Sequence, residues 1–66
     1  MIFAKLLGCR IMIVDDELLV AMMVEDTLIE AGCEVVGPYA RLSEALSAAT
    51  WEQLDGAVLD VNLGGE

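Results

Sequence analysis

Two short apolar stretches, Arg10-Ile-Met-Ile-Val14 and Ala57-Val-Leu59, decide the fold of this chain, because each leads directly into aspartate. Asp15 and Asp16 follow the first stretch, and Asp60 follows the second. A short, nearly continuous apolar run of this kind is typical of a strand that is covered on both faces, as in a parallel sheet. The sequence therefore predicts two such strands, each with carboxylates at its C-terminal end.

Residues 17–31 have the periodicity of a helix. Val20, Val24 and Leu28 recur at four-residue steps, and acids occupy the other faces. Acids in the first turn suit the helix dipole, and Gly32 is well placed as the C′ residue that ends the helix.

Four further residues widen the apolar stripe of this helix beyond what one sheet face would cover: Leu18, Leu19, Met22 and Met23. Their simplest interpretation is ordinary core packing. The alternative is a surface that meets another subunit, because large exposed apolar patches mark interaction sites.

The middle of the chain predicts one more strand and one more helix. Cys33-Glu-Val-Val-Gly37 has the composition of a strand, and we expect it to stop at Pro38, which has no N–H for a sheet ladder. Ser43 is the expected N-cap of a second helix that runs to about Trp51, and Asp55-Gly56 marks a turn. The resulting order, β-α-β-α-β, predicts a single α/β domain with a three-stranded parallel sheet and right-handed crossovers.

Length and charge limit what such a domain can do. The 66 residues can hold one small domain, and a hydrophobic content of 58% excludes intrinsic disorder. So much apolar surface on a short chain suggests a core that a partner completes. Twelve acidic residues against three basic ones give a formal charge of −9, which repels phosphate backbones. We therefore expect no direct contact with nucleic acid.

Cysteine use and the first residues indicate the cytoplasm. Cys9 and Cys33 fit neither a disulfide framework nor a metal-ligand spacing, so both are expected to be reduced, partly buried thiols. Residues 1–9 are too short to span a membrane and lack the pattern of a signal peptide. We expect them to be either a lead-in to the first strand or an extra contact surface. The absence of histidine removes histidine-activated nucleophiles and histidine-ligated zinc.

The three aspartates at the strand ends form the candidate site. Ligands of open parallel sheets bind beyond the carboxyl ends of the strands, so Asp15, Asp16 and Asp60 should converge there if their strands are neighbours. Three uncompensated carboxylates would repel, and Mg²⁺ relieves this because it accepts a few carboxylates and several waters. The Asp15-Asp16 pair alone is better explained as a helix N-cap with a charged neighbour. The second apolar strand that ends in Asp60 favours the metal site.

The residues around these three aspartates resemble those of a known family. Ile11-Met-Ile-Val-Asp-Asp-Glu17 is similar to the first-strand acidic motif of two-component response-regulator receiver domains. Gly56-Ala-Val-Leu-Asp-Val-Asn-Leu-Gly64 is similar to their phosphoacceptor strand and the loop that follows it. Ala31-Gly-Cys-Glu-Val-Val-Gly37 also follows the family, so the resemblance covers residues 10–66. It implies the first part of a flavodoxin-like fold, with strand order 2-1-3.

The resemblance implies a role for each residue of the site. Asp60 would be the phosphoacceptor, which attacks a phosphohistidine on a sensor histidine kinase or phosphotransfer protein and becomes an acyl phosphate. Asp15, Asp16 and Asp60 would bind Mg²⁺ together with the backbone carbonyl of Asn62. A carboxylate is ionised at neutral pH and needs no activating base, so catalysis reduces to in-line positioning and neutralisation of charge by the metal.

The sequence also departs from the family. A complete receiver has five strands, and these residues match the first three, without the hydroxyl residue of the fourth strand and the lysine of the fifth. Lys5 precedes the first strand and does not match that lysine. We therefore expect at most weak autophosphatase activity. The open edge of residues 56–60 favours a homodimer, formed by antiparallel pairing of this strand or by exchange of residues 1–8 or of a helix.

Two other functions fit parts of the sequence, and a third does not. A non-catalytic half-receiver would serve as a protein–protein interaction or dimerisation module, and labelling of Asp60 by a phosphodonor separates it from a phosphoacceptor. Asp60-Val-Asn62 partly resembles the nucleophile motif of haloacid-dehalogenase-type phosphatases, but Asn62 replaces its second carboxylate. An EF-hand loop that starts at Asp60 fails because no bidentate glutamate stands at the required spacing.

Overall fold

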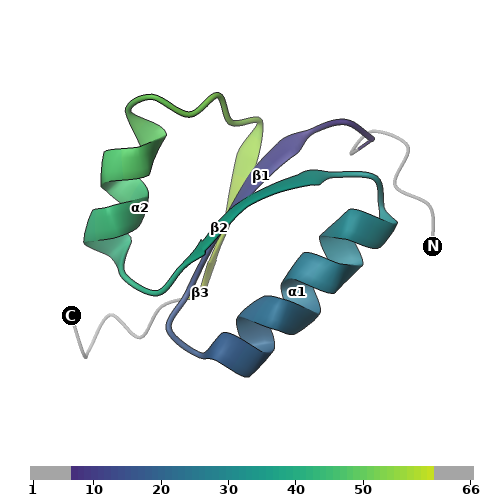
Figure 1. The fold of residues 1–66 in the computed structure, drawn as a ribbon, viewed down its shortest axis with the longest axis horizontal. Helices are drawn as coiled ribbons and strands as arrows, with labels where there is room; N and C mark the ends of the chain where they lie inside the picture. Colours follow the sequence, from purple (N-terminus) through teal and green to yellow (C-terminus); the bar gives the residue numbers. More distant parts are fainter. Residues whose placement is uncertain (1–6, 61–66) are drawn as a thin grey trace.

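The computed structural model describes residues 7–60, which form a three-stranded parallel sheet with one helix on each face (Figure 1). The elements follow one another as β1 (Arg10–Asp15), α1 (Leu18–Glu30), β2 (Glu34–Tyr39), α2 (Leu42–Ala49) and β3 (Gly56–Asp60). The sheet has the order β2-β1-β3, and β1 pairs in parallel with both neighbours. The predicted β-α-β-α-β architecture and the strand order 2-1-3 are confirmed.

The core lies on both sides of the central strand, β1. Its residues 11–14 are all buried, and Val14 is completely inaccessible to solvent. Side chains alternate between the two faces of a strand, so Met12 and Val14 face α2 while Ile11 and Ile13 face α1. The cluster on the α2 side consists of Met12, Val14, Val36, Ala45 and Ala48. Burial on both faces explains why β1 is a nearly continuous apolar run.

Helix α1 ends as the sequence predicts but begins differently. Gly32 has a φ of +90°, the left-handed conformation that suits glycine at the C′ position. Its N–H donates to the carbonyl of Ile29 at 3.0 Å, and the N–H of Cys33 donates to the carbonyl of Leu28 at 3.0 Å, which together make a Schellman motif. The prediction of acids in the first turn is wrong, because Glu17 is the N-cap residue and the first turn contains no acid.

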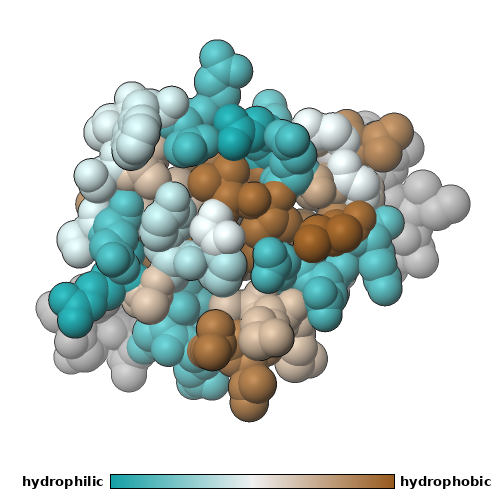
Figure 2. Space-filling model, in the orientation of Figure 1, coloured by the Kyte–Doolittle hydropathy of each residue, from teal (hydrophilic) through white to brown (hydrophobic). Residues whose placement is uncertain are grey.

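The wide apolar stripe of α1 is not core, which corrects the simpler of its two interpretations. Leu18, Leu19 and Met23 are 68%, 76% and 69% exposed, and Met22 is 49% exposed. A helix that rests on one face of a narrow sheet buries a single row of side chains, and in α1 only Ala21 is fully buried. Figure 2 shows the resulting hydrophobic patch over the N-terminal end of α1.

Strand β2 continues through Pro38 to Tyr39, so the predicted end at Gly37 is wrong. β2 is an edge strand, where a residue without an N–H costs no ladder bond if it faces outward. The register with β1 shifts between Met12 and Val14, and β2 holds one more residue than β1 there. Gly37 has a φ of +99°, and a Cβ at this position would lie 2.9 Å from the backbone nitrogen of Tyr39. The bulge therefore requires glycine.

Helix α2 has the predicted length of eight residues but lies two residues earlier in the sequence than predicted. Arg41 occupies the N-cap position without a side-chain cap hydrogen bond, so the assignment of Ser43 as N-cap is wrong. The helix ends at Ala49 rather than near Trp51. The N–H groups of Thr50 and Trp51 donate to carbonyls three residues earlier, which tightens the chain into a turn.

The two cysteines lie where the sequence predicts, and the segment before β1 contacts the end of α1. Cys33 is buried and Cys9 is partly buried, as predicted. The N–H of Gly8 donates to the carbonyl of Gly32 at 2.8 Å, while residues 1–6 of the predicted lead-in lie outside the described residues. Neither helix of the described part is long and apolar enough to cross a bilayer.

Candidate functional site

Two of the three candidate aspartates occupy paired positions at the carboxyl end of the sheet. Asp15 is the last residue of β1 and Asp60 is the last residue of β3, and the parallel register places them side by side. Neighbouring strands lie about 4.8 Å apart, and laterally paired residues of parallel strands point to the same face. The structure thus brings this pair together, while the chemical role of both residues stays a prediction. We call Asp15, Asp16 and Asp60 the carboxyl-end cluster.

Asp15 also has a structural role. It is only 5% exposed, and its Oδ1 accepts a hydrogen bond from the N–H of Glu17 at 2.8 Å. This bond holds the turn that leads from β1 into α1. Asp15 is therefore tied to the start of the helix without being its N-cap, which is Glu17. Of its two carboxylate oxygens, Oδ2 is the one that this contact leaves for a ligand.

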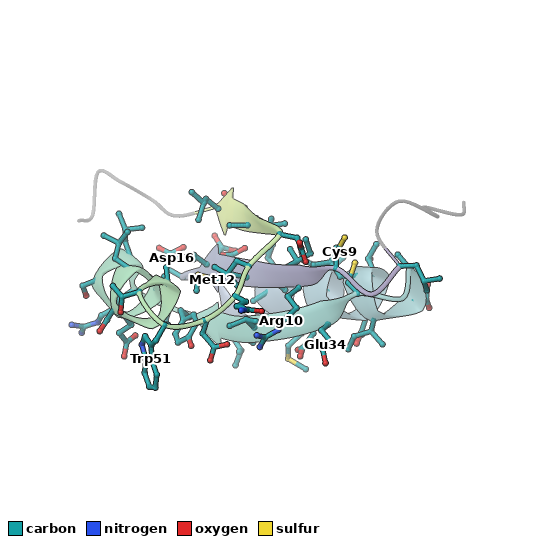
Figure 3. All side chains as sticks on the ribbon, turned by 90° about the horizontal axis from the view of Figure 1, so that it is seen from above. Cys9, Arg10, Met12, Asp16, Glu34 and Trp51 are labelled. Carbon is teal, nitrogen blue, oxygen red and sulfur yellow. The ribbon has the colours of Figure 1, made fainter. Side chains whose placement is uncertain are left out.

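Asp16 is exposed and shares a small pocket with Asp15. The pocket has a volume of about 80 Å³, and its remaining lining comes from the start of α1 and the end of β2: Leu18, Ala21, Pro38, Tyr39 and Ala40. Asp60 is exposed and does not line this pocket, because it lies on the β3 side of Asp15. Figure 3 shows Asp16 and Cys9 at opposite ends of β1. Asp15 is thus the central member of the carboxyl-end cluster.

The chemistry of the cluster suits a hard cation. All of its side-chain donors are carboxylate oxygens, the ligand type that Mg²⁺ prefers. Within residues 7–60, no group of three or more His, Cys, Asp or Glu side chains is close enough to hold a metal ion. Mg²⁺ is usually held by one or two carboxylates and keeps several waters, so it does not require a third carboxylate. Asn62, whose carbonyl is the fourth predicted ligand, lies outside the described residues.

The aspartates of the carboxyl-end cluster form no ion pair in the part of the chain that the structure describes. Both ion pairs found there belong to Arg10 and none to these aspartates. The chain as a whole has a formal charge of −9, which adds to the negative potential at this end. This potential attracts a cation to the cluster.

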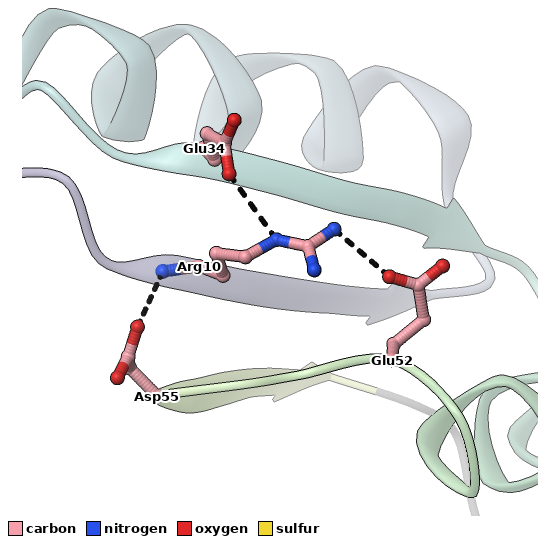
Figure 4. A network of polar contacts seen from close by, with 4 residues as sticks. All are labelled: Arg10, Glu34, Glu52 and Asp55. Carbon is pink, nitrogen blue, oxygen red and sulfur yellow. Dashed lines mark hydrogen bonds and ion pairs between the residues drawn. The ribbon is translucent and has the colours of Figure 1, made fainter.

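A second polar cluster, which the sequence did not predict, lies at the amino end of the sheet (Figure 4). Arg10 Nε lies 3.2 Å from Oε2 of Glu34, and Arg10 Nη2 donates to Oε2 of Glu52 at 2.8 Å. The Arg10 N–H donates to Oδ2 of Asp55 at 2.8 Å, and the Asp55 N–H donates to the Arg10 carbonyl at 2.8 Å. We call these four residues the amino-end cluster. The acids are distant from Arg10 in the sequence, so no local pattern signals them.

Comparisons with known proteins do not identify a family for this chain, so its function has to be inferred from the geometry of the site. No protein-family model, curated protein or solved structure matches the chain. A fold by itself does not define a function, which depends on the residues that the fold brings together.

Proposed function

We propose that this chain is a receiver-type phosphoacceptor of two-component signalling, with Asp60 as the residue that takes the phosphoryl group. The observation that carries the proposal is the lateral pairing of Asp15 and Asp60 at the carboxyl ends of neighbouring parallel strands. Open parallel sheets bind their ligands at such ends. Asp15 is buried and Asp60 is exposed, so Asp60 is the member of the pair that a phosphodonor can reach.

The proposed reaction uses Asp60 as a nucleophile. Its carboxylate is ionised at neutral pH and needs no general base. One carboxylate oxygen bonds to the phosphorus of a phosphohistidine while the phosphorus–nitrogen bond breaks, and the electron pair of that bond leaves with the imidazole. The product is an acyl phosphate on Asp60. Hydrolysis by water returns the carboxylate and releases inorganic phosphate.

Mg²⁺ is the proposed cofactor. One or two of the carboxylates of Asp15, Asp16 and Asp60 would hold it directly and the rest through water, together with the backbone carbonyl of Asn62. When bound, it supplies positive charge that neutralises the oxygens of the transferring phosphoryl group. The chain contributes the positions of the carboxylates. Pairing of β1 with β3 fixes Asp15 beside Asp60, and the 2.8 Å bond from Glu17 N–H fixes the orientation of Asp15. Such prior positioning is the main protein contribution to phosphoryl transfer.

The proposed partner is a sensor histidine kinase or phosphotransfer protein in the cytoplasm, because a phosphohistidine must supply the phosphoryl group. The charge of −9 disfavours nucleic acid as a direct partner. The second candidate function is a non-catalytic interaction module on the same fold. It is favoured by the exposed apolar residues of α1, such as Leu19 at 76% and Met23 at 69%.

Labelling with acetyl phosphate, a small phosphodonor that needs no partner protein, tests the proposal. We expect one phosphoryl group on Asp60 in the presence of Mg²⁺, and none with a chelator or in Asp60→Asn, as measured by intact mass and peptide mapping. Asp26→Asn removes an exposed aspartate of α1 and is the matched control, which should label like the native chain. An adduct on another residue contradicts the assignment. A folded native chain that takes no label with Mg²⁺ is the interaction module instead.

A further inference from the structure

We propose that Cys9 and Cys33 form a reversible disulfide, which closes the amino end of the sheet when the chain meets an oxidant. The oxidant is a peroxide, and a dithiol restores the two thiols. This is the one intramolecular disulfide that the sequence allows, because it contains two cysteines. The inference does not depend on phosphoryl transfer by Asp60, since Figure 3 shows Cys9 and Asp16 at opposite ends of β1.

The backbone holds the two cysteines side by side. Cys9 directly precedes β1 and Cys33 directly precedes β2, and the residues that follow them are paired in the parallel register. Hydrogen bonds join the two segments on either side of the cysteines. The Gly8 N–H donates to the Gly32 carbonyl at 2.8 Å, and the Glu34 N–H donates to the carbonyl of Cys9 at 2.8 Å. Neighbouring strands lie about 4.8 Å apart, and a disulfide joins residues whose Cα atoms are about 4.4–6.8 Å apart.

Both cysteine side chains point to the face of the sheet that α1 covers. Side chains alternate between the two faces along a strand. Arg10 and Glu34 contact one another on the face that α2 covers, where Arg10 Nε lies 3.2 Å from Glu34 Oε2. The residues directly before them, Cys9 and Cys33, therefore point to the opposite face, and Figure 3 shows Cys9 and Arg10 on opposite sides of β1. Cys33 is also fixed at the end of α1, because its N–H donates to the carbonyl of Leu28 at 3.0 Å.

The burial of the two thiols gives them different roles. Cys9 is partly buried, while Cys33 is only 8% exposed, so a peroxide reaches Cys9 first. The formal charge of −9 favours a neutral oxidant of this kind over an anionic one such as glutathione disulfide. A zinc site is a poorer use of the pair, because structural zinc takes four ligands. Within residues 7–60, no group of three or more possible metal ligands is close enough to hold an ion.

The proposed oxidation has two steps. The thiolate of Cys9 attacks one oxygen of hydrogen peroxide, the O–O bond breaks, and the hydroxide that leaves takes up a proton from water. Cys9 is then a sulfenic acid. The sulfur of Cys33 attacks the sulfur of Cys9, the S–O bond breaks, and the departing hydroxide takes the thiol proton of Cys33. The two sulfurs are oxidised to a disulfide, and the peroxide is reduced to water.

The disulfide closes a loop that contains the whole of α1. Such a cross-link stabilises a small protein mainly because it restricts the unfolded chain. The expected rise in Tm is roughly 10–20 °C for a domain of this size. Disulfides in the cytosol are typically transient and serve redox sensing, so the dithiol is the resting form and oxidation stabilises the fold reversibly.

Treatment of the native chain with a slight excess of hydrogen peroxide tests the proposal. We expect the intact mass to fall by two hydrogen atoms and the denatured chain to take no N-ethylmaleimide until dithiothreitol is added. Trypsin cleaves after Lys5, Arg10 and Arg41, so the disulfide should link peptide 6–10 to peptide 11–41. Tm should rise by roughly 10–20 °C and return to its first value after reduction.

Cys9→Ala is the matched control for Tm, because it retains Cys33 and every methionine that peroxide can also oxidise. Its Tm should not rise with peroxide. Asp60→Asn keeps both cysteines and should form the disulfide like the native chain, which separates this inference from the proposed function. The disulfide should also form faster in the folded chain than in urea, because the fold holds the two sulfurs together.

Four results would overturn the proposal. The first is a native chain whose thiols stay unchanged or stop at a sulfenic or sulfinic acid. The second is a disulfide that links two chains instead of two positions of one chain. The third is an intramolecular disulfide that forms faster in urea than in the folded chain. The fourth is a disulfide that leaves Tm unchanged or lowers it, since the two backbones would then have to move for the bond to form.

Discussion

The two ends of the sheet carry acidic residues in opposite arrangements. In the amino-end cluster, three acids surround Arg10, with contacts of 2.8 to 3.2 Å. In the carboxyl-end cluster, the three aspartates form no ion pair in the described part of the chain, although two of them are laterally paired. The chain therefore balances its acids with its own arginine at one end of β1 and leaves them unbalanced at the other.

This difference separates a structural role from a functional one. The amino-end cluster joins β1 to β2 and to the segment before β3, so its charges stabilise the fold. Its contribution is modest, because the Arg10 and Glu34 side chains are 36% and 70% exposed and water screens their attraction. The carboxyl-end cluster has no such ion pair in the described part of the chain, and its one stabilising contact is the hydrogen bond from the Glu17 N–H to Asp15. Its negative charge becomes favourable only when a cation is supplied from outside, which is the property expected of a binding site.

Of the three changes considered, addition of Mg²⁺ should change the stability of the chain most. With Mg²⁺ at about 100 times its dissociation constant, the native chain should gain about 2.7 kcal/mol in the free energy of unfolding, which raises Tm by roughly 10–20 °C in so small a domain. Thermal melts with Mg²⁺ and with a chelator measure this gain. Asp16→Asn should lose most of it, and Asp26→Asn should keep it. Equal melting midpoints for the native chain in both buffers would show that Mg²⁺ does not bind at the carboxyl-end cluster.

Removal of the ion pairs of the amino-end cluster should lower the stability of the chain by less than Mg²⁺ raises it, and by the same amount with and without Mg²⁺. Arg10→Met leaves Glu34 and Glu52 without their ion pair and should cost about 1 kcal/mol, or roughly 4–8 °C in Tm. Urea denaturation with and without Mg²⁺ measures the loss. Arg41→Met removes an exposed arginine from the N-cap position of α2 and should change stability little. An unchanged midpoint for Arg10→Met would show that the cluster adds nothing to the fold.

The smallest effect concerns repulsion within the carboxyl-end cluster when no metal is present. In chelator and at low salt, Asp16→Asn should raise the free energy of unfolding by up to about 0.5 kcal/mol, since it removes one of several like charges. High salt should abolish the gain, because it screens the repulsion that the substitution relieves. Urea denaturation at the two salt concentrations measures both values. If Asp16→Asn instead destabilises the metal-free chain, Asp16 has a structural role like that of Asp15.

The sheet and the paired aspartates could be predicted because both depend on short, local patterns. A strand buried on both faces has to be apolar, as residues 11–14 are, and the aspartate that follows it is plain in the sequence. The alternation of strands and helices then fixes a parallel sheet, whose carboxyl ends lie along one edge. Asp15 and Asp60 meet for this reason, although they are distant in the chain.

The missed features depend on which side of an element is covered or on contacts that are remote in sequence. Pro38 continues β2 because this strand is an edge, and a run of residues does not reveal its neighbours. Leu19 and Met23 are apolar but exposed, because α1 is apolar on several sides and the sheet covers only one of them. The partners of Arg10 come from β2 and from the loop before β3, and only the folded sheet brings them together.

A titration of the ¹⁵N-labelled native chain with Mg²⁺, followed by NMR, tests most directly whether the two ends differ as described. We expect saturable shifts of the amide signals of Asp15, Asp16 and Asp60, and no comparable shifts for Arg10 and Glu34. Ca²⁺ and Na⁺ at matched ionic strength separate binding at a site from general screening of charge. The absence of a saturable shift in the carboxyl-end cluster, or equal shifts at both ends of the sheet, would contradict the account.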